Sequence, residues 1–321
     1  MTAQSAPHAK LGRRQMAVLL RRPQRRSFTL IELLIAISIV AILAVSILFV
    51  MTGAIERANE ARARSQVTRI SELLMRRWEE YRSRPVPIRI PANQGGARAA
   101  WTRLNALWEL KRMEMPDRKS DVFDNQVFLR SRPSLSRAYF RRAQQATGPM
   151  LAGWSETHES AECLYLILAN MRDGDGVATD LFSASEVGDT DGDGMREFLD
   201  PWGNPIYFLR WAPRLRTPIQ SGDPAVAPDP FDPFRAGAPP GAPPNFALFP
   251  FVYSAGPDGQ YGYDQDLDLQ YSQTTAAPPG AVYVAPPGVP TWSNNPYWPM
   301  STAGAPLPGV SNDDIHNHIT Q

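Results

Sequence analysis

Residues 25–50 read RRSFTLIELLIAISIVAILAVSILFV, and this stretch decides the fold that the sequence predicts. Its apolar part, residues 28–51, is long enough to cross a bilayer as an α-helix. One charged residue, Glu32, stands near the beginning of this apolar run. A carboxylate at the centre of a bilayer costs about 2.5–3.5 kcal/mol. Glu32 therefore either reaches the membrane interface or has a partner of opposite charge inside the membrane.

The charges before the apolar run are all basic, because residues 1–27 contain Lys and Arg but neither Asp nor Glu. By the positive-inside rule, the N-terminus stays in the cytoplasm and the residues after the membrane segment lie on the other side. A cleaved secretory signal peptide fits less well, because the run is too long and no small-residue cleavage site follows it. A simple membrane anchor remains open.

The helix is expected to continue beyond the membrane over residues 52–82. Apolar residues recur there at spacings of three and four, which predicts one apolar face packed against a globular head. Prolines at positions 85, 87 and 91 then end the helix. The apolar face consists of Val67, Ile70, Leu74, Trp78 and Tyr81.

The order RRSFTLIELL, residues 25–34, resembles the class III signal of type IV pilins and type II secretion pseudopilins. The resemblance implies that a prepilin peptidase cuts between Ser27 and Phe28 and methylates the new N-terminal residue to N-methylphenylalanine. The family usually has Gly at the position of Ser27. The apolar segment stays in place after the cut, and Glu32 becomes the fifth residue of the mature chain. In this family that glutamate pairs with the N-terminal amine of the neighbouring subunit and sets the register of the filament.

Three further pieces, in this order, resemble the head of the major pseudopilins: DPWGNPIYFLRW (200–211), PFVYSAGPDG (250–259) and SNDDIHNH (311–318). In that family the last two pieces bind one structural calcium ion, and oxygen-only, carboxylate-rich ligation suits Ca²⁺. A disordered acidic tail is the alternative interpretation. The ligands that the resemblance implies are the side chains of Asp258, Asp313 and Asp314 and the backbone carbonyls near Ala255, Gln260 and Ser311.

An acidic loop, GDTDGDGMREFLD at residues 188–200, has the spacing of an EF-hand calcium loop. Its first, third and fifth places carry carboxylates, and a glycine at the sixth place allows a sharp turn. An acidic turn exposed to solvent is the alternative. The second possible metal site therefore consists of Asp189, Asp191, Asp193, Glu197 and Asp200, with the backbone carbonyl of Met195.

The remaining sequence predicts helices at 98–115, 134–146 and 156–171, and strands at 206–211 and from 250 onward. Proline-rich loops are expected at 212–249 and 275–310, since most of the 31 prolines follow residue 200. Cys163 is the single cysteine, so no internal disulfide can form, and we expect it to be a buried small apolar residue.

The net charge of +1 argues against a nucleic-acid-binding protein. The sequence has no Gly-rich phosphate loop, no HExxH, no CxxC and no G-x-S-x-G elbow. His316 and His318 are expected to be solvated tail residues rather than metal ligands. Nothing in the sequence favours an enzyme.

The predicted fold is α+β and type IV pilin-like, with a long N-terminal transmembrane helix packed on a small antiparallel sheet head and an inserted helical region. The segments are a prepilin leader (1–27), a transmembrane segment (28–51), an amphipathic continuation of the helix (52–82), a mainly helical insert with the acidic loop (83–199) and a β-rich, Pro-rich head (200–321).

The resemblance implies a structural subunit, a pseudopilin of a type II secretion system that assembles into a periplasmic pseudopilus and contains Ca²⁺. Its partners would be other pilin-like subunits, the prepilin peptidase and methyltransferase, the platform proteins of the secretion system and the bacterial inner membrane. A type IV pilus subunit or minor tip pilin that binds a surface or cargo is the first alternative. A membrane-anchored periplasmic calcium-binding receptor or enzyme is the second.

Overall fold

The computed structural model describes residues 28–88, 95–238, 244–265, 304–307 and 313–318. The chain divides into two compact units, Met1–Gly53 and Ala54–Gln321. The predicted leader, Ser27, Ser311 and most of the second proline-rich loop lie outside the described residues.

Helix α1 (Leu30–Glu80) is 51 residues long and confirms the predicted helix, which ends close to the expected Arg82. The side chains of its first part, within the first unit, are exposed. Among the described residues, α1 is the one helix that is long and apolar enough to cross a membrane. Within the second unit the helix is amphipathic, and all five residues of the predicted apolar face are buried.

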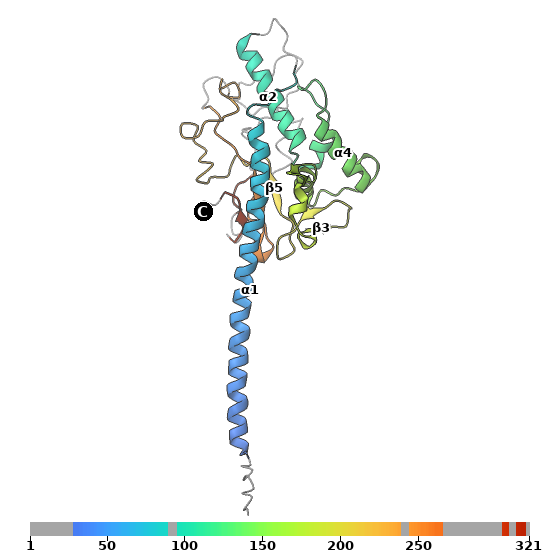
Figure 1. The fold of residues 1–321 in the computed structure, drawn as a ribbon. Coiled ribbons are helices and arrows are strands. Elements are labelled where there is room, and N and C mark those ends of the chain that lie inside the picture. Colours follow the sequence, from blue (N-terminus) through green and yellow to red (C-terminus); the bar gives the residue numbers. More distant parts are fainter. Residues whose placement is uncertain (1–27, 89–94, 239–243, 266–303, 308–312, 319–321) are drawn as a thin grey trace, which may run out of the picture. The chain divides into compact units, whose positions relative to one another are not determined.

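The second unit contains further helices, most of which the sequence predicts (Figure 1). They are α2 (Gly96–Glu114), α3 (Lys119–Phe123), α4 (Ser134–Thr147) and α5 (Glu159–Leu168). Short 3₁₀ turns follow at Pro149–Leu151, Ala178–Leu181, Ala184–Glu186 and Gly256–Asp258. Helix α3 is an addition to the prediction, and α5 is shorter than expected at both ends.

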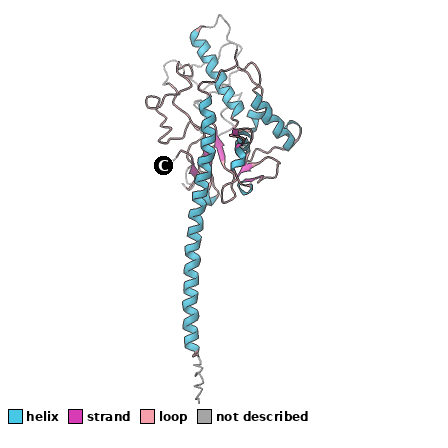
Figure 2. Cartoon of the chain, in the orientation of Figure 1, coloured by secondary structure: helices cyan, strands magenta, loops and turns pink. Residues whose placement is uncertain are grey.

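The strands of the described residues are short and form three small antiparallel sheets (Figure 2). The first two are hairpins, β1 (Arg172–Asp173) with β2 (Gly176–Val177), and β3 (Val187–Gly188) with β4 (Glu197–Phe198). The third has the order β5-β6-β7 and consists of Tyr207–Leu209, Phe251–Ser254 and Ile315–His316. Both strands expected from the sequence are therefore present, and β7 completes their sheet.

The two faces of the β5-β6-β7 sheet pack into different clusters, as the alternation of side chains along a strand requires. Phe208 and Val252 join the main core, which also contains the buried residues of α1, α2 and α5. Tyr207, Phe251 and Tyr253 point the other way and pack in a smaller aromatic cluster. The helices of the 83–199 region and the strands of the 200–321 region thus share one main core.

Cys163 of α5 is free and fully buried, as expected.

Buried ion pairs link α2, α3 and the end of β5. Arg210, after β5, lies 2.7 Å from Asp121 of α3 and 3.2 Å from Asp117. Arg112 of α2 lies 3.2 Å from the second oxygen of Asp121. Removing one partner from such a buried network leaves an uncompensated charge, which typically costs about 3–5 kcal/mol.

The α+β arrangement, with its long N-terminal apolar helix, small antiparallel sheets and further helices, agrees with the expected pilin-like fold. Side chains of the second unit bond its part of α1 to the sheet region. Gln66 donates to the carbonyl of Leu199 at 2.8 Å, and Asn317 donates to the hydroxyl of Ser71 at 2.9 Å. These bonds fix the sheet that carries one of the candidate sites.

Candidate functional sites

Glu32 closes a capping box at the start of α1. Its Oε2 accepts hydrogen bonds from the backbone N–H and from the hydroxyl of Thr29, both at 2.9 Å. Its own N–H donates to the Thr29 hydroxyl oxygen at 3.3 Å. This reciprocal arrangement is the signature of a T-x-x-E sequence at a helix N-terminus, so the sequence carried a signal for this role that our two interpretations of Glu32 did not use.

The capping box uses one oxygen of the Glu32 carboxylate. No described residue donates to the other oxygen, Oε1. Phe28, just before the cap, is 84% exposed, whereas Ser27 lies outside the described residues. The start of the helix therefore offers an oriented carboxylate with one free oxygen beside an exposed aromatic residue.

The three pieces of the head that resemble the major pseudopilins come together around β6. Asp200, from the first piece, accepts a hydrogen bond from the Ser254 hydroxyl at 2.7 Å. Asn204 donates to the carbonyl of Gly256 at 3.1 Å. Ser254 pairs in turn with Ile315 of β7. Segments that are far apart in the sequence thus meet at the C-terminal end of β6, the central strand of the sheet.

Asp200 lies in this turn and does not join the carboxylates of the acidic loop. Its Oδ1 accepts from the backbone N–H groups of Trp202 and Asn204, each at 2.9 Å, while its Oδ2 accepts from Ser254. Because β4 continues the chain past the loop in an extended conformation, Asp200 is carried away from the twelfth ligand place that the EF-hand spacing predicts. Burial raises the pKa of Asp200, and these hydrogen bonds oppose that shift.

The C-terminal acidic group consists of Asp258, Asp313 and Asp314. Gly256 allows the two segments to approach, because its φ is +70° and a Cβ there would lie 2.7 Å from the carbonyl oxygen of Asp313. Asp314 Oδ2 accepts from the backbone N–H of Gly262 at 2.6 Å, and Asp258 Oδ1 accepts from that of Gln260 at 2.8 Å. The segment that carries Asp258 and the one that carries Asp313 and Asp314 thus lie against each other, but the three carboxylates do not form a group whose oxygens all lie within 4.8 Å of one another.

Two carboxylate oxygens of this group are buried without a partner. The Oδ1 atoms of Asp313 and Asp314 have no hydrogen-bond partner among the described residues. Burial raises the pKa of Asp314 to about 7, and the charges of Asp313 and Asp258 add to the shift. Unpaired, buried and mutually repelling oxygens fit a bound Ca²⁺. Of the residues predicted to offer backbone carbonyls, Ala255 directly follows β6 and is buried, whereas Ser311 lies outside the described residues.

The acidic loop connects β3 to β4, and its first carboxylates bind the loop's own backbone. Asp189 accepts from the N–H groups of Gly192 and Gly194, at 2.8 and 3.0 Å. Asp193 accepts from that of Met195 at 2.7 Å. Gly194, with φ of +97°, has the sharp turn that the sequence predicts at the sixth place. The loop is therefore ordered by its own side chains.

Two groups of three carboxylates occur on this loop, and in each the ligand atoms lie within 4.8 Å of one another. One group is Asp189, Asp191 and Glu197, and the other is Asp191, Asp193 and Glu162. Glu197 is buried and accepts from the N–H of Thr190 at 3.2 Å. Burial, with the charges of Asp191 and Asp189, raises the pKa of Glu197 to about 7. The structure thus unites four of the five predicted side chains, together with a residue from elsewhere.

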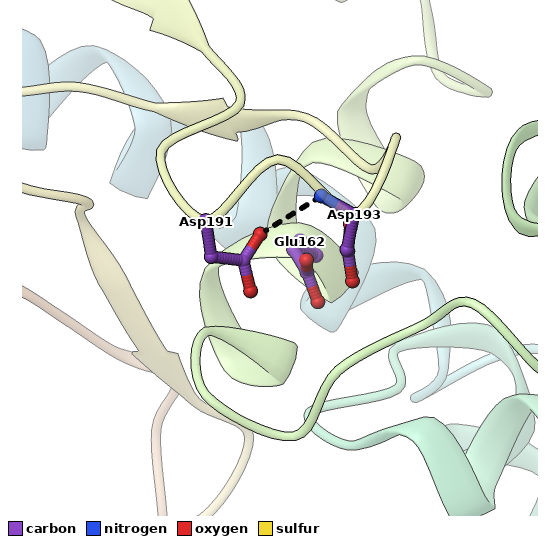
Figure 3. Close-up of side chains that lie close together, drawn as sticks. All are labelled: Glu162, Asp191 and Asp193. Atoms are coloured by element: carbon purple, nitrogen blue, oxygen red, sulfur yellow. Dashed lines mark hydrogen bonds between the residues drawn. The ribbon is translucent and has the colours of Figure 1, made fainter.

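Glu162 is the functional candidate that the sequence did not reveal. It belongs to α5, and Figure 3 shows its carboxylate beside those of Asp191 and Asp193. Burial raises the pKa of Glu162 to about 9, although its bond from the Trp154 indole opposes the shift. An acidic residue within the apolar segment ESAECLYLIL was the one available signal, and only the tertiary fold places it under the loop.

The prediction that the tail histidines are solvated is wrong for His318, which is 1% exposed. Its Nε2 donates to the carbonyl of Pro250 at 3.1 Å, and its Nδ1 accepts from Thr217 at 3.2 Å. Burial lowers the pKa of His318 to about 4. Both ring nitrogens serve the fold, because the tail adds a strand to the sheet and carries this ring inward.

Comparison with known proteins gives one match. The prokaryotic N-terminal methylation motif matches residues 22–48. The matched range includes the predicted cleavage position and Glu32, and ends before the second unit begins. No curated protein and no solved structure matches the chain.

Proposed function

We propose that this type IV pilin-like protein is a pseudopilin, a structural subunit that polymerises through its N-terminal helix in a type II secretion system. The premise is the methylation motif at residues 22–48 together with the long apolar helix, both of which are features of type IV pilin-like proteins. The family that carries this motif is structural rather than enzymatic. The observation that carries the proposal is the carboxylate of Glu32, held at the start of α1 by Thr29 through one oxygen, while its other oxygen accepts from no residue that the structure describes.

The geometry at the helix start suggests how subunits join. Cleavage before Phe28 creates a new amine, four residues ahead of Glu32 in the sequence. The Thr29 cap fixes Oε2 of Glu32, so Oε1 can accept a hydrogen bond from the amine of a neighbouring subunit. Such a pair offsets the cost of a lone carboxylate in an apolar environment. The same pair would set the axial register of the filament.

The apolar segment gives the protein a membrane anchor typical of pilins. We place the basic N-terminus in the cytoplasm and the head in the periplasm, in accordance with the positive-inside rule. The prepilin peptidase, other pilin-like subunits and the secretion platform are the partners that this proposal requires.

The proposed head contains one structural Ca²⁺, held by Asp258, Asp313 and Asp314. The two buried Oδ1 atoms without partners support this site, as does the pairing of β6 with β7, which brings both acidic segments together. Backbone carbonyls near Ala255, Gln260 and Ser311 would complete the oxygen shell. The cation would neutralise the three carboxylates and tie the C-terminal segment to the sheet, in a chain that cannot use a disulfide.

A type IV pilus subunit or minor tip pilin is a second candidate. The four helices α2–α5 favour it, because they add a large helical surface to the small sheet of the head and could carry a binding site for cargo. A head that binds cargo without polymerising would support this candidate over a pseudopilus subunit.

Intact mass measurement and N-terminal sequencing of the protein extracted from its own membrane test the proposal. A chain that begins at Phe28 and is heavier by one methyl group is the expected result. A chain that begins at residue 1 or 2 would overturn prepilin processing and would favour a membrane-anchored receptor or enzyme. Secretion by a strain that lacks the gene then separates a type II pseudopilin, whose loss blocks export, from a pilus subunit.

A further inference from the structure

The acidic loop lies against helix α5, and one side chain of that helix joins the loop's carboxylates (Figure 3). Glu162, Asp191 and Asp193 each bring an oxygen within 4.8 Å of the others. Asp191 also belongs to the second group, with Asp189 and Glu197. Five carboxylates thus form two overlapping groups of three that share Asp191, and the group with Glu162 spans the loop and the helix.

Glu162 itself indicates a missing partner. Its side chain is fully buried, and its Oε2 accepts a hydrogen bond from the indole N–H of Trp154. Its Oε1 is buried and has no hydrogen-bond partner among the described residues. A buried carboxylate oxygen without a partner typically costs about 1–3 kcal/mol or more, so such an atom requires an explanation. This observation is independent of the acidic composition of the loop.

Within the described part of the chain, no salt bridge joins any of the five carboxylates to Lys, Arg or His. Arg196, the basic residue of the loop, is exposed. The donors that reach the group are neutral: Ser155 donates its N–H to Asp193 at 2.6 Å and its hydroxyl to Asp191. Neutral donors leave the mutual repulsion of the carboxylates uncompensated.

We propose that the loop between β3 and β4 and the helix α5 together bind one Ca²⁺ ion, with Glu162 as the ligand contributed by the helix. The side-chain ligands are Glu162, Asp191 and Asp193, and Asp189 and Glu197 complete the acidic shell. The buried glutamate of α5 takes the part that the EF-hand spacing assigned to Asp200. The ion bound here is distinct from the one proposed at the C-terminal acidic group.

The donor set selects the cation. All five side chains offer carboxylate oxygens, and neither His nor Cys belongs to either group. Zn²⁺ prefers nitrogen and sulfur ligands, whereas Mg²⁺ keeps several waters and uses one or two carboxylates. Ca²⁺ accepts six to eight oxygens in flexible geometry, which suits carboxylates from two separate elements.

The cation would add a polar link to the apolar contacts that already join the loop and α5. Phe198 of β4 packs on Tyr165 of α5, and Met195 of the loop lies in the main core. Helix α5 is bonded to the sheet through Ser160, whose hydroxyl accepts from the N–H of Phe208 at 3.0 Å. A Ca²⁺ ion between Asp193 and Glu162 would therefore fasten the β3–β4 hairpin to the β5-β6-β7 sheet by way of α5. In this chain, which has a single cysteine, the ion would provide the kind of cross-link that a disulfide provides in other proteins.

Calcium titration of the full chain in detergent tests the site. We use a background of Asp258→Asn with Asp313→Asn, which disables the other proposed site. Terbium luminescence excited through tryptophan reports binding, because the indole of Trp154 bonds to the proposed ligand Glu162. In this background we expect one bound ion, and Trp154→Phe should reduce the luminescence while calorimetric Ca²⁺ binding persists.

Glu162→Gln and Asp193→Asn are the decisive variants, since both keep side-chain shape and remove charge. Each should weaken Ca²⁺ binding at least tenfold. Glu159→Gln is the matched control: it lies one turn away on α5, its carboxylate accepts from the N–H of Lys119, and it belongs to neither group. Wild-type affinity in both decisive variants would overturn the proposal, as would an equal loss in Glu159→Gln. Asp193→Asn, in a partly exposed loop position, keeps the test valid if Glu162→Gln does not fold.

Discussion

The hydroxyl of Ser254 donates to the carboxylate of Asp200 at 2.7 Å, and this bond joins the turn after β4 to the central strand of the sheet. Both residues are buried. The other oxygen of Asp200 accepts from two backbone N–H groups of the turn. One side chain thus holds both the conformation of the turn and its position against β6, and it needs no cation to do so.

Replacing Asp200 with alanine should therefore destabilise the head. The substitution leaves the buried Ser254 hydroxyl without its acceptor, which typically costs about 1–3 kcal/mol, and it also removes the acceptor of two N–H groups in the partly exposed turn, which water can reach. We expect a loss of roughly 2–4 kcal/mol in the free energy of unfolding. Urea unfolding of the full chain, followed by circular dichroism, measures it. Asp175→Ala, in the exposed turn between β1 and β2, should stay within about 0.5 kcal/mol of wild type.

Glu32→Gln separates the two roles of this residue. Glutamine can keep the capping box with Thr29, because its side-chain oxygen accepts the same bonds, but it removes the charge that would pair with an amine. If subunit pairing depends on the charge, Glu32→Gln and Glu32→Leu should both abolish filament formation, with membrane insertion unchanged. Crosslinking in intact cells, scored for multimers, gives the answer. Normal multimers in Glu32→Gln would leave Glu32 with a capping role alone.

Periodicity and motifs predicted the parts of this fold that depend on local sequence. The apolar face of α1 was recognisable because apolar residues recur at spacings of three and four. The helices α2 and α4 begin and end within about two residues of the predicted bounds. The five-residue α3 is too short to show a period, so the sequence did not predict it.

Buried charge is what the sequence could not reveal. We did not predict from the sequence that Arg112, Arg210 and Glu162 are buried, because Arg and Glu are almost never fully buried unless they are paired. Their partners lie on other elements: Arg112 and Arg210 share Asp121 of α3, and Glu162 meets the β3–β4 loop. Only the tertiary fold brings these groups together. The same reason explains Asp200, whose spacing suggested a metal ligand and whose bonds belong to a turn.

The buried network around Arg210 should be essential for folding. Arg210→Met leaves Asp117 and Asp121 buried without their main counter-charge, and we expect a loss of about 3–5 kcal/mol. Thermal unfolding of the full chain measures the change. Arg64→Met removes the exposed Arg64–Glu60 pair and should cost less than about 1 kcal/mol. Equal effects of the two substitutions would contradict the importance of the buried network.

His318 should make the head sensitive to acid. Its folded-state pKa of about 4 lies below the ordinary value of about 6.5, so the unfolded chain takes up the proton first. Its contribution to stability is therefore complete above about pH 6.5 and declines as the pH falls toward 4, by up to about 3 kcal/mol. Unfolding free energies of wild type and His318→Asn between pH 7 and pH 4 test this. The variant should show a shallower decline, and an identical pH profile would exclude His318 as a cause.

Calcium removal should loosen the C-terminal strand if Asp258, Asp313 and Asp314 hold an ion. At a free Ca²⁺ concentration one hundred times the Kd, binding stabilises the folded state by about 2.7 kcal/mol. Chelation should then accelerate amide exchange of β7 (Ile315–His316) by up to roughly a hundredfold, because this strand pairs with β6 next to the acidic group. Hydrogen-exchange mass spectrometry with and without EGTA measures the effect locally. Glu162→Gln should leave the response of β7 intact, whereas Asp314→Asn should exchange rapidly in both conditions. Slow exchange of β7 in EGTA would show that the strand is held by protein contacts alone.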